Sequence, residues 1–396
     1  MQDNVPTLLG KTRIDGATVP RSDWDRAPWN RWSFQHVREL LPTAPVWRGA
    51  EKPTDLPKDL QDFGEISFEL DGVRHSVNSV LDASFTDGFL VLHRGKVVTE
   101  IYSNGMMPQT PHLAQSVSKS IVGATCGILV GKGLVDPDAP ITSVLPELAQ
   151  TAYRGATIRH LLDMSSGVTF EEDYTATNSH MAQLDSASGW KAATDPAWPG
   201  SVWDLILRLT EAESDHGQTF SYRSIETDVL AFVLQRITGS SLAELISQEL
   251  WSQIGAEEDA YFTVDPTGYA LADGGFNACL RDFGRFALLH LNDGVTGRGK
   301  RLLHSDWIAD TRAGSPSEFG ALYTGILPDG SYRNQFWIED QDRRALLARG
   351  VFGQLIYIDP ESDFAAVKLS SWPEFVSHDR TRITLAAVHA IKASLR

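Results

Sequence analysis

The chain contains 396 residues, which is too long for one small domain and suits one large domain or two modest ones. Its 42% hydrophobic and 22% charged residues are typical of a globular protein with a substantial core. The net charge of −16 excludes a basic surface for phosphate-backbone binding, and two cysteines are too few for a disulfide framework or a cysteine-rich zinc site.

Residues 1–80 are rich in proline, tryptophan and aspartate and show weak periodicity. We expect an irregular N-terminal arm packed on the body of the protein, because its tryptophans need apolar surroundings. These tryptophans are Trp24, Trp29, Trp32 and Trp47. Residues 89–94 and 97–102 then flank a short Gly95-Lys96 turn, which predicts a β-hairpin.

The sequence from about residue 115 to residue 310 has a helical character. Two long amphipathic patterns are clear, over residues 118–132 and 225–237. Gly133 and Gly239 follow them at C-cap positions, where glycine favours the end of a helix. The apolar run at residues 121–131 is too short to span a bilayer, so we expect no membrane-spanning segment.

Strand patterns return near the end of the chain. Residues 322–327 and 332–338 are predicted to form a hairpin around the turn at residues 328–330. Further strands are predicted over residues 346–349, 354–358 and 364–369, and a final amphipathic helix over residues 380–395.

Strands at both ends with helices between them predict an α/β fold of the α+β type. In this fold an antiparallel sheet is built from both chain ends, and a helical domain is inserted into it. We assign residues 81–114 and 321–396 to the sheet domain and residues 115–320 to the helical domain, with the active site in the cleft between them.

A Ser-x-x-Lys motif, Ser116 to Lys119, begins the first long helix. Positions three apart share a helix face, so the lysine amine can reach the serine hydroxyl and act as its base. This requires burial and nearby positive charge to lower the pKa of the lysine. The pattern alone is weak, since Ser188 to Lys191 matches it equally well in polar sequence with no helix following.

Two later segments of the sequence strengthen the interpretation of Ser116 and Lys119 as a catalytic pair. Tyr222, followed by Ser224 just before the second long helix, is suited to shuttle a proton between nucleophile and leaving group. Gly350 and Gly353 at the end of a late strand permit close approach of a substrate to the backbone. The N–H groups of Ser116 and Val351 are therefore candidate oxyanion donors.

Taken together, these motifs resemble the serine β-lactamase and penicillin-binding family. Linking segments at residues 133–146, 157–167 and 274–286 agree with this resemblance, which covers residues 85–395. Within the family, the chain is most similar to the branch that hydrolyses nylon oligomers. The residues that carry this second resemblance are Asn30-Arg31-Trp32, Gln115 to Ser120, Glu172-Asp173-Tyr174, Asp185, Ser188-Gly189-Trp190, residues 227–231, Gly353-Gln354 and residues 370–373.

The resemblance implies a role for each matching residue. Ser116 would be the acylated nucleophile, Lys119 its base and Tyr222 the proton relay, with the oxyanion held by the N–H groups of Ser116 and Val351. The substrate-binding residues would be Tyr174, which closes over the scissile amide, Asp185, which attracts a substrate ammonium, and Trp190, Asp273 and Phe352, which border the site.

The chain also departs from the family. Ala348-Arg349-Gly350 stands where the β-lactam-recognising branch has Lys-Thr-Gly, and there is no Glu-x-x-Leu-Asn run to provide a separate deacylating base. Both departures argue against a dedicated β-lactamase. Phe352 replaces the histidine that relatives tend to carry before the Gly-Gln pair, which affects fine specificity.

We therefore expect a serine hydrolase that cleaves short linear amides, such as the linear dimer of 6-aminohexanoate or similar ω-amino acid oligomers. The alternatives are a carboxylesterase acting on short acyl esters, a D-amino-acid peptidase, and a non-catalytic binding member of the fold. We expect no metal or organic cofactor and no nucleic-acid or membrane partner, and a homodimer is left open. Residues 1–16 lack the features of a secretion signal, which predicts a cytoplasmic protein.

Overall fold

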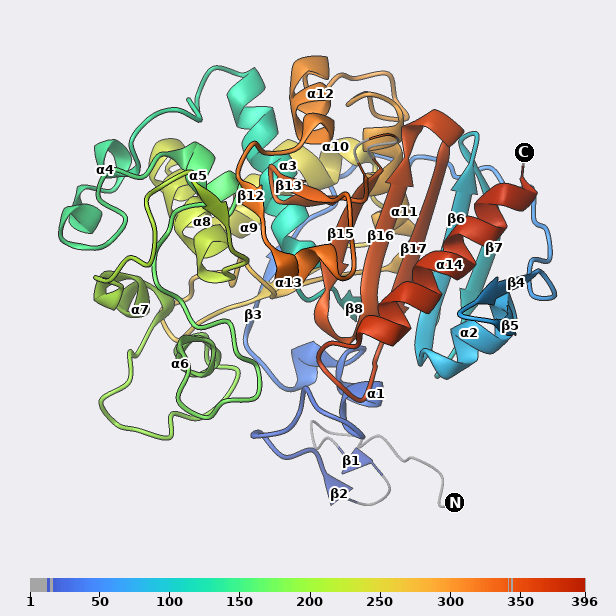
Figure 1. The fold of residues 1–396 in the computed structure, drawn as a ribbon, viewed down its shortest axis with the longest axis horizontal. Coiled ribbons are helices and arrows are strands. Elements are labelled where there is room, and N and C mark those ends of the chain that lie inside the picture. Colours follow the sequence, from blue (N-terminus) through green and yellow to red (C-terminus); the bar gives the residue numbers. More distant parts are fainter. Residues whose placement is uncertain (1–12, 15–16, 341, 343–344, 396) are drawn as a thin grey trace.

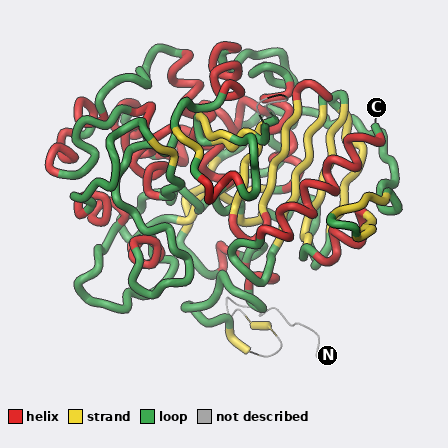
Figure 2. The backbone as a smooth tube through the Cα atoms, viewed as in Figure 1, coloured by secondary structure: helices red, strands yellow, loops and turns green. Residues whose placement is uncertain are grey.

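A computed structural model describes residues 13–14, 17–340, 342 and 345–395 (Figure 1). The expectation about a secretion signal therefore lies largely outside the described residues. Figure 2 separates the molecule into a part dominated by a large sheet and a part dominated by helices and loops.

The large sheet has seven antiparallel strands in the order β13-β14-β15-β16-β17-β6-β7. Its strands come from both chain ends, as the sequence predicts. They are β6 (Thr86–His93), β7 (Lys96–Tyr102), β13 (Ser331–Arg333), β14 (Phe336–Ile338), β15 (Leu346–Gly350), β16 (Gln354–Asp359) and β17 (Phe364–Ser370). The central strands β16 and β17 are buried along their whole length, because helices cover both faces of the sheet.

Side chains of β6 show how the two faces are covered. Phe89 and Val91 pack in a cluster with residues of α14 (His378–Ser394), which crosses the front of the sheet in Figure 1. Leu90 and Leu92 point to the opposite face and pack against α11 (Leu280–Leu291). Alternate residues of a strand face opposite sides, so a sheet with two covered faces needs continuous apolar strands.

The segment between the two sheet portions is mostly helical. The central helix α3 (Val117–Gly131) packs against β14, β15 and β16 and against α8 (Ile225–Thr238). Gly133 and Gly239 have φ angles of 70° and 71° and end these helices, as predicted. The other helices of this segment are α4 (Ile141–Val144), α5 (Ile158–Leu162), α6 (His180–Ala187), α7 (Val202–Arg208), α9 (Leu242–Ile246), α10 (Ser252–Ile254) and α12 (Ser305–Ala313).

Short elements complete the fold. A second sheet has the order β3-β10-β11-β8, and two-strand ladders are formed by β1-β2, β4-β5 and β9-β12. Their bounds are β1 (Arg13–Ile14), β2 (Ala17–Thr18), β3 (Thr43–Val46), β4 (Ser67–Leu70), β5 (Val73–Ser76), β8 (His112–Leu113), β9 (Thr219–Phe220), β10 (Ala260–Thr263), β11 (Phe276–Ala278) and β12 (Glu318–Phe319). The remaining helical turns are α1 (Asn30–Ser33), η1 (Val37–Glu39), α2 (Val77–Ala83), η2 (Pro146–Gln150), η3 (Ser247–Trp251), α13 (Ala321–Thr324), η4 (Val351–Gly353) and η5 (Pro360–Ser362).

The N-terminal arm is tied to the body by pairing and by polar contacts. Its strand β3 pairs with β10, and the Asn30 side chain donates to the carbonyl of Trp372 at 2.6 Å. Trp24 is fully buried, and Trp29 and Trp32 are half-buried against the core, but Trp47 is 57% exposed, so the expectation of apolar surroundings is wrong for Trp47. The proposed division of the chain into arm, sheet domain and helical domain stays a prediction.

The predicted hairpin over residues 322–338 is wrong in its first half. Residues 321–324 form α13, and Leu322 is 71% exposed. The hairpin is instead β13-β14, whose two-residue turn places Asn334 and Gln335 at φ angles of 51° and 67°. The Asn334 side chain stabilises this turn by donating to Asp310 and Thr311, both at 2.9 Å, and an apolar pattern cannot reveal such contacts.

Among the described residues, no single helix is both long and apolar enough to cross a membrane. One bent pair, α8 with residues 242–254, reaches the required length and composition only when both helices are counted, and they meet at 78°.

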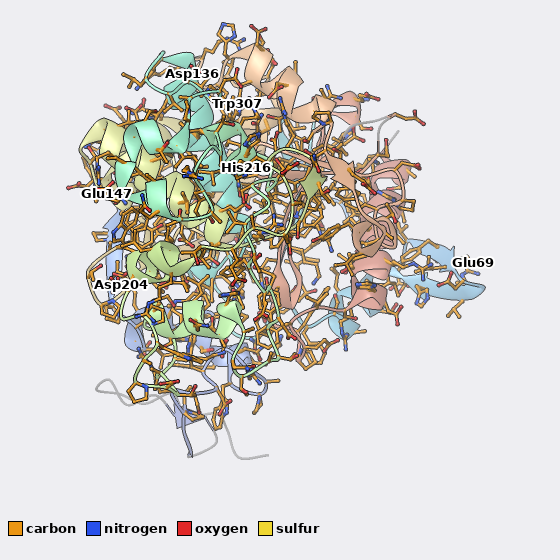
Figure 3. All side chains as sticks on the ribbon, turned by 60° about the vertical axis from the view of Figure 1, so that its left-hand side comes forward. Glu69, Asp136, Glu147, Asp204, His216 and Trp307 are labelled. Atoms are coloured by element: carbon orange, nitrogen blue, oxygen red, sulfur yellow. The ribbon has the colours of Figure 1, made fainter. Side chains whose placement is uncertain are left out.

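Close packing of α3 generates a stability prediction. A Cβ atom on Gly127 would collide with the indole ring of Trp307, a residue of α12 labelled in Figure 3. We expect Gly127→Ala to lower the free energy of unfolding by about 1–3 kcal/mol, because overpacking displaces a buried ring. Urea unfolding would measure this loss. Gly131→Ala in the same helix is the control, since its Cβ would only touch the His304 side chain at 4.0 Å. Equal stability of both variants would contradict the packing argument.

Candidate active site

Ser116 and Lys119 meet at the beginning of α3. Ser116 is the N-cap residue, and the Lys119 ammonium donates to its hydroxyl at 2.9 Å. The same ammonium donates to the carbonyl of Asp273 at 2.6 Å and lies 3.8 Å from the Asp273 carboxylate. The Lys119 side chain is only 1% exposed. The Ser-x-x-Lys spacing therefore produces the expected contact, within a buried polar cluster.

Tyr222 reaches the same cluster from the loop that precedes α8. The Lys119 ammonium lies 5.2 Å from the centroid of the Tyr222 ring. Hydrogen bonding to Ser116 and Lys119 acts to lower the pKa of the phenol, but burial has the larger effect and raises it. The ring also stacks on Trp337 of β14, with centroids 5.4 Å apart, so the sheet holds the phenol in place.

The backbone of β15 approaches Ser116 very closely at Gly350. A Cβ atom there would lie 2.8 Å from the carbonyl oxygen of Ala114 and 3.0 Å from the nitrogen of Ser116. Glycine is therefore required for the strand to reach the start of α3. Val351 follows directly and lines both cavities beside Ser116, as expected for a partner in an oxyanion hole.

The charges around Lys119 differ from the sequence-based expectation. Burial acts to lower its pKa, but Tyr222, Asp273 and Glu172 together raise it above the ordinary value. The expected positive neighbour and lowered pKa are therefore wrong, because anionic groups surround this ammonium. Lys119 is an ammonium at neutral pH, and its hydrogen bond to Ser116 is donated by the nitrogen.

Glu172 is a residue of this cluster to which sequence reasoning gave no role. Its carboxylate accepts from the Tyr174 hydroxyl at 2.6 Å and from the Ser224 N–H at 2.8 Å. The Ser224 hydroxyl donates to it at 2.5 Å. Glu172 thus ties Tyr174 to the beginning of α8. Its sole sequence signal was its position two residues before Tyr174.

Two cavities meet at Ser116. The larger, of about 290 Å³, is mainly apolar and includes Tyr222, Trp337 and Arg349. The smaller, of about 20 Å³, has room for one water and includes Asp185, Trp190 and Asp273. Three residues line both cavities, namely Ser116, Tyr174 and Val351. The Ser116 hydroxyl therefore faces an apolar space on one side and a small acidic space on the other.

Asp185 lies in the small cavity but already has an ammonium partner. Lys191 is 2.9 Å from its carboxylate and 3.1 Å from that of Asp25. Burial raises the pKa of Asp185 to about 6, against the lowering effect of Lys191. The second Ser-x-x-Lys match therefore places its lysine in an ion-pair cluster. Trp190 forms a wall of the cavity and donates to the Thr263 hydroxyl at 2.9 Å.

Phe352 is absent from the residues that line the two cavities at Ser116, so its predicted contact with substrate stays a prediction that these cavities do not support. Its φ angle of 61° turns the side chain away from the site. The ring is buried between Phe34 and Phe375, with centroid distances of 5.2 and 4.6 Å. Phe352 directly follows Val351 in the chain, and its buried ring anchors the backbone at this point.

Within the described part of the chain, His, Cys, Asp and Glu side chains form no group of three that could hold a metal ion.

Comparison with known proteins shows which family the chain resembles. The Beta-lactamase family model matches residues 82–391. The 6-aminohexanoate-dimer hydrolase of Paenarthrobacter ureafaciens is 36% identical over 354 residues, which are 89% of this chain and 88% of the relative. A solved structure from Bacillus anthracis, assigned as a 6-aminohexanoate-dimer hydrolase, is 30% identical with a TM-score of 0.86, covering 95% of this chain and 97% of that one.

More distant structures share the fold alone. EstCE1, described as a hydrolase with promiscuous acyltransferase activity, has a TM-score of 0.63 at 16% identity, covering 80% of this chain and 98% of that one. These findings confirm the fold and family expected from the sequence. Because the family model matches well over half of its residues, the chain belongs to the β-lactamase family.

Proposed function

We propose that this protein is a serine hydrolase that cleaves short linear amides through an acyl-enzyme on Ser116. The linear dimer of 6-aminohexanoate is its proposed substrate. The 2.9 Å hydrogen bond between Lys119 and Ser116, at the junction of two cavities, carries the proposal. The name of the Paenarthrobacter ureafaciens relative supports the choice of substrate.

The first step is attack by the Ser116 oxygen on the substrate carbonyl carbon. The Lys119–Tyr222 pair must first lose one proton, after which it can accept the proton of the serine hydroxyl. The carbonyl oxygen becomes an oxyanion and accepts hydrogen bonds from the N–H groups of Ser116 and Val351. Donors already fixed in place stabilise this charge without reorganisation.

The second step is breakage of the C–N bond. An amine is a poor leaving group unless it is protonated, and the Tyr222 hydroxyl is the donor placed on the side of the larger cavity. Water then attacks the acyl-serine ester and gives a proton to the same pair. The bond between the acyl carbon and the Ser116 oxygen breaks, the pair returns the proton to that oxygen, and the acid product leaves. The enzyme thus uses one relay in both halves of the reaction.

Charge in the small cavity suits a substrate that carries an ammonium group. Two carboxylates, Asp25 and Asp185, share the one ammonium of Lys191, and Asp273 adds a third carboxylate nearby. The cluster is therefore net negative when its carboxylates are ionised, and attraction to a cation is stronger in such a desolvated place than at the surface. We assign Asp185 and Asp273 to recognition of the ammonium end of the acyl half.

A second candidate is hydrolysis of short acyl esters. The small cavity holds about one water molecule, which fits an acetyl group better than a six-carbon acyl chain. The longer chain can enter only if Tyr174 or Trp190 moves. A D-amino-acid peptidase stays an alternative, a cytoplasmic location stays a prediction, and a homodimer stays open.

Hydrolysis of two substrates tests the proposal. We expect the wild type to cleave both 6-aminohexanoate linear dimer and p-nitrophenyl acetate, and Ser116→Ala to lose both activities by at least about 1000-fold. Product release followed by chromatography and absorbance measures these rates. Ester cleavage without dimer cleavage would favour the second candidate. Activity retained in Ser116→Ala would refute the assignment of the nucleophile.

The Tyr222→Phe variant tests whether the Tyr222 hydroxyl gives a proton to the leaving amine. We expect kcat to fall by about 100-fold or more for the amide and much less for the p-nitrophenyl ester, whose leaving group needs no proton. Steady-state kinetics on both substrates measures the difference. Tyr323→Phe is a matched control, because its hydroxyl contacts the Tyr222 N–H and does not reach Ser116. Equal losses on both substrates would argue against the relay.

The raised pKa values of Lys119 and Tyr222 predict an alkaline dependence. Both groups hold their protons at neutral pH, so kcat/KM should rise with pH until the pair has lost one proton. Asp273→Asn removes an anion that stabilises the ammonium, so the midpoint of this rise should move to lower pH. A pH–rate profile of both proteins checks the direction. A shift to higher pH would contradict it.

A further inference from the structure

A single arginine lies among the apolar walls of the larger cavity. Arg349 is next to last in β15, opposite Leu355 of β16, and both residues line the cavity. Leu347, two positions earlier on the same face, is paired with Trp337 of β14. The pleat therefore brings the Arg349 guanidinium over the Trp337 ring, 5.2 Å from its centroid.

The guanidinium has no ionic partner. Among the described residues, Arg349 makes neither an ion pair nor a hydrogen bond through its side chain, and the stacking on Trp337 is its main contact. Desolvation lowers its pKa to about 10, with only the Tyr222 phenol acting to raise it. The guanidinium is still charged at that value. A desolvated, unpaired guanidinium gains most from a planar anion that accepts two hydrogen bonds.

One carboxylate lies in the same cavity but is already occupied. Glu172 accepts from Tyr174 and Ser224, and its charge is balanced by Lys119. His378 lies at the exposed rim of the cavity. Among the described residues that line this cavity, no anionic side chain pairs with Arg349, which lies between the rim and Ser116.

The position of Tyr222 decides which half of a substrate this site would meet. Tyr222 lines the larger cavity and is absent from the residues of the smaller one. Because its hydroxyl gives the proton to the departing amine, the leaving half must lie in the larger cavity. The acyl half then lies toward the acidic side.

We propose that Arg349 binds a carboxylate carried by the leaving half of the substrate. The inference rests on the proposed function and sharpens it: the substrate class is a linear amide that ends in a free acid beyond the scissile bond. Asp185 and Asp273 would then bind the ammonium end of a zwitterionic chain, and Arg349 would bind its carboxylate end. Arg349 then fixes the direction in which the chain binds.

Ligand binding to an inactive variant tests whether Arg349 binds a carboxylate. In Ser116→Ala protein, calorimetric titration would compare 6-acetamidohexanoate with 6-acetamidohexanamide, which differ only in the terminal carboxylate and carboxamide. We expect the acid to bind about ten-fold more tightly or better. In Ser116→Ala/Arg349→Gln the two dissociation constants should agree within about two-fold. Arg349→Met tests the same point if the Gln variant does not fold.

A matched control separates the local contact from net charge. Arg382 of α14 is paired with Asp71 on the surface, so Ser116→Ala/Arg382→Gln loses the same charge and should keep the full preference for the acid. The inference is overturned if the Ser116→Ala protein does not prefer the acid, or if a folded Arg349 variant keeps that preference. Failure of the proposed function would appear separately, as absence of dimer hydrolysis by the wild type.

Discussion

The buried ammonium of Lys119 is the constraint on which the site depends. Removing a charge from water is costly unless polar partners replace its hydration. Here the partners are the Ser116 hydroxyl, the carbonyl and carboxylate of Asp273, and the more distant carboxylate of Glu172. These groups come from three separate chain segments, so the charge of one lysine fixes how the loops around α3 are arranged.

Glycine makes this arrangement possible on the other side of Ser116. Gly350 lets the end of β15 touch the turn before α3, and Gly127 lets α12 pack onto α3. The end of β15 and the beginning of α3 are thereby in contact, and the N–H groups of Ser116 and Val351, the proposed oxyanion donors, belong to this junction. The chemistry of the site therefore follows from close backbone packing as much as from its reactive side chains.

Trp337 lies in the larger cavity and contacts Tyr222, the proposed relay. The Tyr222 ring stacks on it, and the Arg349 guanidinium lies over it. The negative face of an indole ring attracts a cation, and the same ring can stack against a phenol. One rigid side chain therefore positions both groups. In contrast, Asp185 and Lys191 form an ion pair on the acidic side. The two sides of Ser116 thus differ in both polarity and charge.

Elements with strong periodicity and clear ends could be predicted from local sequence patterns. These were the hairpin of β6 and β7, helices α3, α8 and α14, and strands β15 to β17, together with the spacing of Ser116 and Lys119. Local propensity, glycine caps and helical periodicity act over a few residues, so they are readable without tertiary contacts.

Properties that depend on neighbours distant in sequence became apparent in the folded protein. The anionic surroundings of Lys119, the pairing of Asp185 with Lys191 and the burial of Phe352 between two other rings arise from segments far apart in sequence. The turn at Asn334 belongs to the same group, because its stability comes from polar contacts to α12. Electrostatic interactions and burial depend on the distances between residues in the folded protein, and a pattern in the sequence does not give these distances.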